Sequence, residues 1–249
     1  MVSIINSSVM IVIPARLNST RLPAKILSEI HGKSMIYWVA KRVISAKIAR
    51  VIVATDSDEV LSLCKSENIP VTLTSDKCEN GTERVFEVSR QFPEVEYFVN
   101  IQGDEPLINV EVIREIISAK INKDSFYTAV SRIPQNENNS SEIKVAIDNS
   151  NRIRFASRSP IPYFRSAHGD RYKIHGVYLY SREVLLKYVS CTPGVLELSE
   201  AVEQLRCIEW DIPIYAIKTS PTERSVDTLE DLVYMRSIPR SNFLMGIDS

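Results

Sequence analysis

The sequence predicts an α/β fold, with a mostly parallel sheet covered by helices on both faces. Through about the first 133 residues, apolar runs of strand length alternate with amphipathic stretches of helix length. This alternation is typical of βαβ units, because a parallel strand is reached through a crossover that usually contains a helix. A chain of 249 residues with 44% hydrophobic and 24% charged residues can bury a large core. We therefore predict one domain over residues 1–249.

The predicted elements follow one another regularly. The apolar run 9–13 predicts the first strand, and the stretch 35–48 has its apolar residues at helical spacing. The same reasoning predicts further strands at 50–55, 71–74, 97–101 and 127–131, and helices at 58–67, 83–91 and 110–119. Because crossovers are right-handed, the carboxyl ends of these strands share one edge of the sheet. We expect the loops after the first strand and after the strand 97–101 to lie together.

The pattern changes after about residue 133. A polar stretch precedes the runs 144–148 and 152–157, which predict antiparallel strands around a turn-rich tetrad. The remaining predicted elements are a strand at 176–180, a helix at 195–208, a strand at 214–217 and a helix at 228–235. We interpret residues 133–195 as a smaller α+β lobe inserted into the α/β domain.

The loop after the first predicted strand is crowded with cations. It runs from residue 14 to residue 25 and contains Arg16, Arg21 and Lys25, with two hydroxyl residues and an asparagine at 18–20. In α/β proteins, ligands bind beyond the carboxyl ends of the strands. Guanidinium and ammonium groups there suit the oxygens of a polyphosphate.

Two aspartates are candidates for a metal site. Asp104 follows the strand 97–101, after Gly103, which allows a sharp turn and the close approach of a ligand. Proteins usually hold Mg²⁺ with one or two carboxylates together with substrate phosphates. Asp104 could equally serve only the turn or cap a helix. Asp227 precedes the last predicted helix, which Asp227 or Thr228 could simply cap.

Other motifs have plainer interpretations. Residues 80–84 read as a turn into a helix whose N-terminus faces the ligand edge. His175, alone at the start of a strand, is more typical of a structural histidine. The run 203–206 lies on a predicted helix, where a solvated face is the simpler interpretation.

Composition and missing motifs exclude several classes of protein. A net charge of −1 argues against a general nucleic-acid binder. No apolar run reaches the roughly 20 residues of a membrane helix, and the N-terminus does not read as a signal peptide. The four cysteines have no CxxC spacing, so we expect reduced thiols and a cytoplasmic protein. Zinc-protease, serine-hydrolase, P-loop and nicotinamide-binding motifs are absent.

Several segments together resemble one family, the CMP-Kdo synthetases (3-deoxy-manno-octulosonate cytidylyltransferases). They occur in the family's order over nearly the whole chain: IPAR (13–16), STRLPAK (19–25), VATD (53–56), GTER (81–84), NIQGDEP (100–106), SRSPIPY (157–163), GVY (176–178), EQLR (203–206) and VDT (226–228). Each piece is weak alone, whereas the combination is highly specific.

The resemblance implies an enzyme that joins CTP to the anomeric hydroxyl of a 2-keto-3-deoxy sugar acid, giving a CMP-sugar and pyrophosphate. It implies a Rossmann-like, GT-A-like nucleotidyltransferase sheet and a homodimer formed through the inserted lobe. By the same resemblance, the nucleotide is bound by Ala15, Arg16, Arg21, Lys25 and Gln102, the acid by Arg158, Tyr178, Glu203 and Gln204, and Mg²⁺ by Asp104 and Asp227. The implied catalytic residues are Arg16, Lys25, Asp104 and Asp227. Neither nucleic acid nor a membrane is an expected partner.

Two departures from the family concern function. The family usually has Gly where this chain has Ala24, and His where it has Ile174, with His175 one position along. A one-residue shift along a strand turns a side chain to the opposite face. The acceptor therefore stays open among Kdo, a modified octulosonate, a nonulosonate-like acid and a phosphonate.

Two other classes of function stay open. A glycosyltransferase of similar sheet architecture would consume a nucleotide-sugar, although it normally has an Asp-x-Asp pair where this chain has Gln102-Gly103-Asp104. The other class is a nucleotide-binding relative without catalytic activity.

Overall fold

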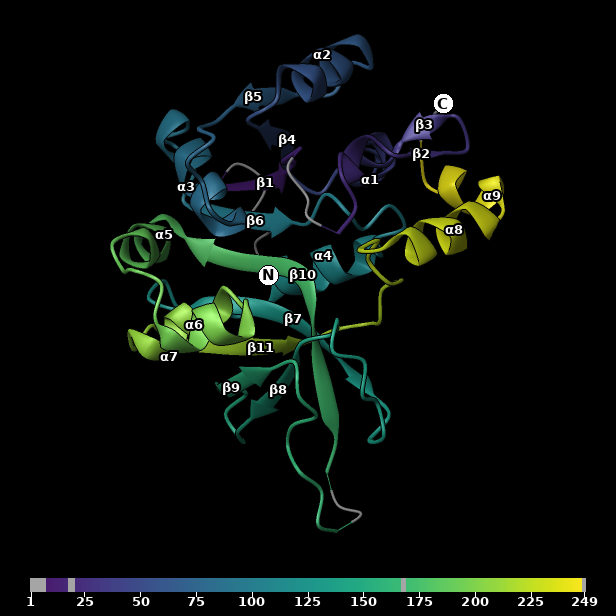
Figure 1. Cartoon of the computed structure of the whole chain (residues 1–249). Helices are drawn as coiled ribbons and strands as arrows, with labels where there is room; N and C mark the ends of the chain where they lie inside the picture. The colour runs from purple at the N-terminus through teal and green to yellow at the C-terminus, as the bar shows by residue number, and fades with distance from the viewer. Residues whose placement is uncertain (1–7, 18–20, 167–168, 248–249) are drawn as a thin grey trace.

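The parallel half of the sheet forms as the sequence predicts. The computed structural model describes residues 8–17, 21–166 and 169–247. Its nine-stranded sheet contains the path β11-β7-β10-β6-β1-β4-β5, with β8 and β9 branching from β10 (Figure 1). The mutually parallel strands are β1 (Val9–Pro14), β4 (Arg50–Thr55), β5 (Val71–Leu73) and β6 (Tyr97–Ile101). The strand β1 is buried on both faces because Met10 and Val12 pack into one core cluster, whereas Ile11 and Ile13 pack into the other.

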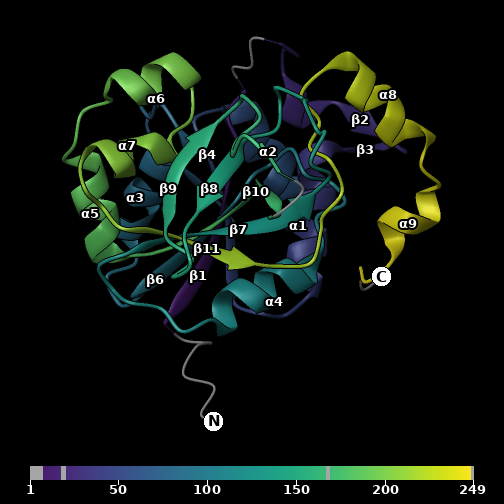
Figure 2. The same cartoon turned by 90° about the horizontal axis from the view of Figure 1, so that it is seen from below.

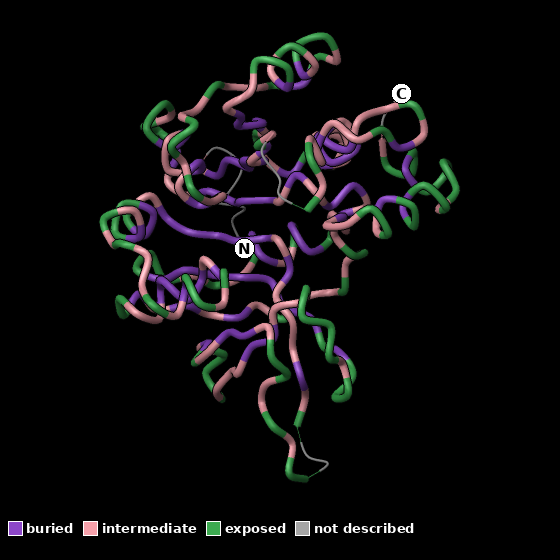
Figure 3. Tube along the Cα trace, in the orientation of Figure 1, coloured by how far each residue is buried: buried purple, intermediate pink, exposed green. Residues whose placement is uncertain are grey.

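Helices cover both faces, which confirms the predicted α/β fold. On one face lie α1 (Met35–Ser45), α2 (Asp58–Ser66) and α4 (Val110–Ser118), and on the other lie α3 (Gly81–Gln91), α5 (Arg182–Val189) and α7 (Gln204–Glu209). Figure 2 shows α3, α5 and α7 on one side of the strands and α1 and α4 on the other. In Figure 3 the buried segments follow the central strands and the inner faces of these helices.

Helix starts follow local capping chemistry. The side chains of Ser34, Ser57, Asn80 and Ser181 each accept a hydrogen bond from a backbone N–H in the first turn of the helix that follows. Such caps satisfy donors that a helix leaves unpaired. Residues 80–84 therefore form the predicted turn into a helix. The helix α5, which we did not predict, begins in the same way.

The second half of the sheet is mixed. The strand β10 (Arg171–Ser181) runs antiparallel to β6 and to β7 (Phe126–Ile133), and β11 (Ile214–Lys218) runs parallel to β7. The first part of β10 also pairs with β8 (Lys144–Ile147), which in turn pairs with β9 (Ile153–Ser157). The strands β8 and β9 and the first part of β10 project below the main body in Figure 1. Because the second part of β10 lies beside β6 in the main sheet and α5 packs on α3, residues 176–189 of the predicted 133–195 lobe belong to the main layer.

The C-terminal segment packs across the edge that carries the cationic loop. The helices α8 (Leu229–Ser237) and α9 (Arg240–Leu244) form a third core cluster with Trp38, near the short strands β2 (Glu29–Ile30) and β3 (Lys33–Ser34). Backbone N–H of Val226 donates to the carbonyl of Asp104 over 2.9 Å. This contact brings the segment before α8 to the loop after β6.

The four cysteines, Cys64, Cys78, Cys191 and Cys207, are free, as the absence of CxxC spacing predicts. Within the described part of the chain, no helix is both long and apolar enough to cross a membrane.

Candidate active site

A cleft of about 860 Å³ opens at the carboxyl-end edge of the sheet. It is lined by every predicted site residue except Ala15 and Lys25, that is by Arg16, Arg21, Gln102, Asp104, Arg158, Tyr178, Glu203, Gln204 and Asp227. Ala15 is buried directly behind, and its N–H donates to the carbonyl of Ala54 over 2.8 Å. The residues that the resemblance singles out therefore gather around one space. Residues 18–20 of the cationic loop lie outside the described residues.

Asp104 and Asp227 meet on Lys25. Nζ of Lys25 lies 2.5 Å from Oδ2 of Asp104 and 3.1 Å from Oδ1 of Asp227. Arg21 also contacts Oδ1 of Asp227, over 2.9 Å. Two carboxylates far apart in the sequence thus share one ammonium group. Burial alone would lower the pKa of Lys25, but the two aspartates outweigh it and raise this pKa, so the lysine is charged at neutral pH.

The cap of α8 is Thr228 and not Asp227. The hydroxyl of Thr228 accepts from the N–H of Asp231, and the carboxylate of Asp231 accepts from the N–H of Thr228, which together form a capping box. The side chain of Asp227 is therefore not used by the helix. Its carboxylate faces the two cations of the first loop instead.

Lys25 begins the 3₁₀ turn η1 (Lys25–Leu27), directly after Ala24. Ala24 has φ 51° and ψ 32°, in the left-handed region. An L-residue there is strained by roughly 1–2 kcal/mol because its Cβ approaches the following carbonyl oxygen, whereas glycine is not. The Gly that is usual at this position in the resembled family fits this backbone better than Ala does.

We expect Ala24→Gly to raise the free energy of unfolding by about 1 kcal/mol, because relief of strain exceeds the added flexibility of the unfolded chain. For a chain of this size the midpoint of thermal unfolding should rise by about 2–4 °C. The matched control is Ala40→Gly inside α1, which should lower the midpoint because Ala40 is a buried helical residue. A midpoint unchanged or lowered by Ala24→Gly would contradict the argument.

The nucleotide side of the cleft combines the first loop with the start of α3. Arg16 is exposed, and its guanidinium donates to the carbonyl of Glu79 over 3.3 Å. Asn80 and Gly81, at the N-terminus of α3, line the same space as Gln102. The helix dipole favours negative charge at such an end. This side therefore presents cations and the positive end of a helix dipole to an anion.

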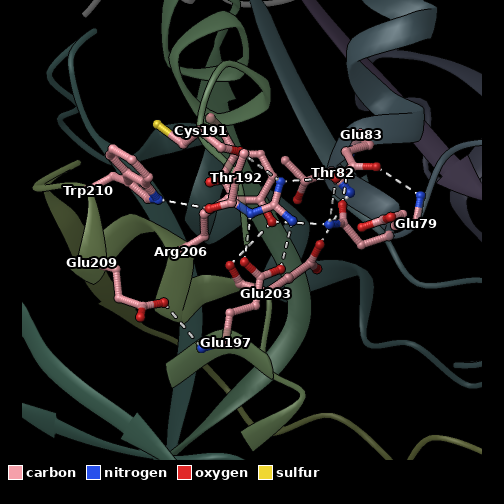
Figure 4. Close-up of polar contacts among 12 residues, drawn as sticks. Glu79, Thr82, Glu83, Cys191, Thr192, Glu197, Glu203, Arg206, Glu209 and Trp210 are labelled. Atoms are coloured by element: carbon pink, nitrogen blue, oxygen red, sulfur yellow. Dashed lines mark hydrogen bonds and ion pairs between the residues drawn. The ribbon is translucent and has the colours of Figure 1, made fainter. Parts of the chain in front are cut away.

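The part of the cleft wall that the resemblance assigns to the sugar acid, here called the acid side, includes Tyr178, Glu203 and Gln204. A carboxylate oxygen of Glu203 accepts from the N–H of Thr82, 3.3 Å away, at the start of α3 (Figure 4). Nε2 of Gln204 donates to the other carboxylate oxygen over 3.4 Å. Burial raises the pKa of Glu203 and holds the pKa of Tyr178 well above its usual value. The plainer interpretation of residues 203–206 as a solvated face is wrong, since Gln204 and the two residues after it are buried.

The predicted helix 195–208 is two helices, α6 (Val195–Glu200) and α7. Ala201 ends α6 in the left-handed conformation, with φ 51°. Periodicity alone did not predict this break because Ala is a good helix former. The break carries Glu203 and Gln204 inward to the cleft.

Arg158 reaches the cleft but uses much of its guanidinium on main-chain carbonyls. It donates to the carbonyls of Glu200, Ala201 and Ser140 over 2.7, 3.1 and 3.1 Å. Because a guanidinium has five N–H donors, two remain for a ligand carboxylate. Through its bonds to Glu200 and Ala201, Arg158 therefore also stabilises the turn after α6.

Sequence reasoning missed Glu105. This side chain is buried, lines the cleft and accepts from the N–H of Gly176 over 3.0 Å through Oε1. A Cβ at position 176 would lie 2.3 Å from that oxygen and 2.6 Å from Cγ of Gln102, so any other residue there would displace these two side chains. Burial, helped by the charge of Asp104, raises the pKa of Glu105 to about 8. His175, which precedes Gly176 on β10, is also buried. This burial, together with the charge of nearby Lys173, lowers the pKa of His175 to about 4.

Comparisons with known proteins agree with this geometry. A family model described as cytidylyltransferase matches residues 10–216. The 3-deoxy-manno-octulosonate cytidylyltransferase of Chlorobium phaeobacteroides is 35% identical over 93% of this chain and 97% of its own length. That of Neisseria meningitidis serogroup C is 36% identical over 92% and 96%.

A solved structure of a CMP:2-keto-3-deoxy-manno-octonic acid synthetase complexed with CTP superposes with a TM-score of 0.83. It is 33% identical and covers 93% of this chain and 98% of its own. The expected Rossmann-like nucleotidyltransferase sheet is thereby confirmed. The chain belongs to the cytidylyltransferase family, among the relatives of the 3-deoxy-manno-octulosonate cytidylyltransferases.

Proposed function

We propose that this protein transfers a cytidylyl group from CTP to the anomeric hydroxyl of a 2-keto-3-deoxy sugar acid, Kdo or a related acid. The observation that carries the proposal is the meeting of Asp104 and Asp227 on Lys25, beside the arginines of the first loop. Relatives named 3-deoxy-manno-octulosonate cytidylyltransferase support the substrate class. Free cysteines and a nucleotide substrate favour the cytoplasm, and the resemblance favours a homodimer through the lobe.

In this proposal the first loop holds the triphosphate. Arg16, Arg21 and Lys25 present fixed positive charge where the phosphates would lie. Gln102 lines the cleft on the cytidine side, and Ala15 is buried behind that wall. The sugar hydroxyl attacks the α-phosphorus in line, the bond from that phosphorus to the bridging oxygen breaks, and pyrophosphate leaves. The hydroxyl proton passes to solvent. Phosphoryl transfer of this kind depends mainly on positioning and charge stabilisation, which the cations of this loop supply.

The cofactor in this proposal is Mg²⁺, held by Asp104 and Asp227. Their oxygens are the hard ligands that Mg²⁺ prefers, and two carboxylates plus substrate phosphates and waters are a usual set. Among the described residues, no group of three or more His, Cys, Asp or Glu is placed to hold a metal, so substrate and water have to complete the shell. When bound, Mg²⁺ would neutralise phosphate charge and polarise the attacking oxygen. Arg21 and Lys25 already pair with these carboxylates, so the site tolerates a cation.

The acid side orients the acceptor. Arg158 has donors left for a carboxylate, and Tyr178, Glu203 and Gln204 offer hydrogen-bonding groups to sugar hydroxyls. Ile174 and His175 both line the same cleft, so the position that is His in the resembled family offers no hydrogen-bonding group here, whereas the next position does. This keeps a modified octulosonate, a nonulosonate-like acid and a phosphonate as alternative acceptors.

An acceptor panel tests the proposal. The protein is incubated with CTP, Mg²⁺ and each of Kdo, a modified octulosonate, a nonulosonate and a phosphonate, and pyrophosphate is measured. We expect pyrophosphate only when an acid is present, and most from the natural acceptor. Nucleoside diphosphate released from a nucleotide-sugar would favour the glycosyltransferase instead. No reaction with any acceptor would favour a relative without catalytic activity.

A further inference from the structure

Arg206 is a deeply buried cation two residues after Gln204, beside the acid side of the cleft. Its side chain is 2% exposed, and all three guanidinium nitrogens are engaged. Nε and Nη2 form a two-pronged pair with the carboxylate of Glu197, over 2.6 and 2.8 Å, and Nη1 donates to Glu83 over 3.0 Å. The guanidinium carbon lies 4.4 Å from the ring centre of Tyr188. Figure 4 shows this cluster joining three separate segments of the chain.

These contacts join helices that would not be stable in isolation. Both α6 and α7 contain six residues, below the length at which an isolated helix is stable in water. Glu209, the last residue of α7 and three residues after Arg206, accepts from the N–H groups of Leu196 and Glu197 and so caps α6. The pair α6–α7 is thereby one unit, and tertiary contacts decide where it lies.

Arg206 and Glu203 attach this unit to the start of α3. Arg206 does so through Glu83, and Glu203 does so through the N–H of Thr82. Glu203 and Gln204 line the cleft, whereas Arg206 is absent from its wall. A small shift of α7 would therefore move both groups that face the acid.

We propose that Arg206 is a positioning residue for acid binding: through Glu197 and Glu83 it fixes the place of Glu203 and Gln204 without touching the substrate. The inference rests on the proposed function, since the sugar acid is the ligand that those two side chains would hold. Arg206 suits the task because a planar guanidinium satisfies two carboxylates in fixed directions, which a lysine ammonium does not.

CTP binding should be largely spared when Arg206 is changed. The start of α3 is stabilised by contacts that do not involve Arg206. Oδ1 of Asn80 accepts from the N–H of Glu83 over 2.9 Å, and the second carboxylate oxygen of Glu83 accepts from the N–H of Glu79 over 2.8 Å. The nucleotide side therefore keeps its shape without the arginine. Glu203 on the acid side is held by longer contacts: its carboxylate accepts from the N–H of Thr82 and from Gln204 over 3.3 and 3.4 Å, and its carbonyl accepts from the hydroxyl of Tyr188 over 3.3 Å.

The test compares Arg206→Lys and Glu197→Gln with the native protein. For each we measure KM for the acid acceptor and KM for CTP from pyrophosphate release, together with CTP affinity by calorimetry and the thermal midpoint. We expect KM for the acid to rise about 10-fold to 100-fold, as for other residues that orient a contacting group. The affinity for CTP should stay within about 2-fold, because the α3 contacts persist. Glu197→Gln keeps a neutral hydrogen-bond acceptor and guards against failure to fold. Because Glu197 itself lines the cleft, the conclusion about positioning depends on Arg206→Lys.

The matched control is Arg182→Lys. Arg182 also donates to several partners, the carbonyls of Ser89, Phe92 and Val95, but it does not line the cleft. The Arg182→Lys substitution should lower the midpoint of thermal unfolding while leaving the KM for the acid and the KM for CTP unchanged. If Arg206→Lys behaves like this control, or raises both KM values equally, the arginine is merely structural and the proposal is overturned. If the native protein releases no pyrophosphate with any acid, the proposed function fails first, which separates the two failures.

Discussion

Asp104→Asn should abolish acid-dependent pyrophosphate release, lowering kcat by about 10³-fold or more. The amide loses the negative charge that would hold Mg²⁺ beside the phosphates, and several kcal/mol of transition-state stabilisation go with it. The fold should persist, because the contact from Val226 uses the main-chain carbonyl of Asp104 and not its side chain. Steady-state pyrophosphate assays and the thermal midpoint, measured on the same preparation, separate these effects.

A second readout follows the metal itself. Bound Mn²⁺, counted by electron paramagnetic resonance in the presence of CTP, should fall in Asp104→Asn relative to the native protein. Asp124→Asn is the control, since Asp124 lies in an exposed loop outside the cleft lining. Near-normal pyrophosphate release from Asp104→Asn would remove this carboxylate from the catalytic machinery.

Lys25→Met should change turnover and metal binding in opposite directions. Turnover should fall by about 10²–10³-fold, the usual loss when one charge-stabilising donor is removed from the site of reaction. Metal binding without nucleotide should strengthen, because the ammonium lies between Asp104 and Asp227 and competes with a divalent cation for the same oxygens. The native protein should therefore bind Mn²⁺ weakly until CTP draws the lysine toward its phosphates.

The measurement is Mn²⁺ affinity with and without CTP, alongside pyrophosphate release. The control is Lys33→Met, because Lys33 also forms a close pair, 2.6 Å from Glu67, but lies outside the cleft lining. We expect neither quantity to change in the control. Native turnover in Lys25→Met would contradict the role in charge stabilisation, and unchanged Mn²⁺ affinity in the absence of CTP would contradict the competition with the metal.

Local sequence signals predicted the elements well where the chain itself supplies the cause. The strand 50–55 and the strand 97–101 have the predicted bounds, because short β-branched and aromatic runs specify buried strands. The helix at 58–67 begins where Ser57 caps it. By contrast, the strand predicted at 176–180 extends from Arg171 to Ser181, since its earlier residues pair with β7 and β8. Such pairing depends on partners that the local sequence does not name.

The site shows the same division. Arg16, Lys25 and Asp104 were identified because they follow strands whose carboxyl ends share an edge, and that edge is where the cleft lies. Glu105 was missed, and Arg206 was assigned to a solvated helix face. Only their surroundings in the folded chain distinguish these two residues from surface residues. Burial and paired partners come from segments far along the chain, which no local pattern displays.

The sequence by itself determined the order of strands and helices, the cationic loop after the first strand, and the two acids as metal candidates. These features depend on periodicity, capping and residue chemistry, which are local properties. Only the tertiary structure decided that Thr228 leaves Asp227 free to face Lys25, that the chain breaks at Ala201, and that Arg206 is enclosed by carboxylates. Those outcomes arise from packing between remote segments, where the cost of burying an unpaired charge selects the partners.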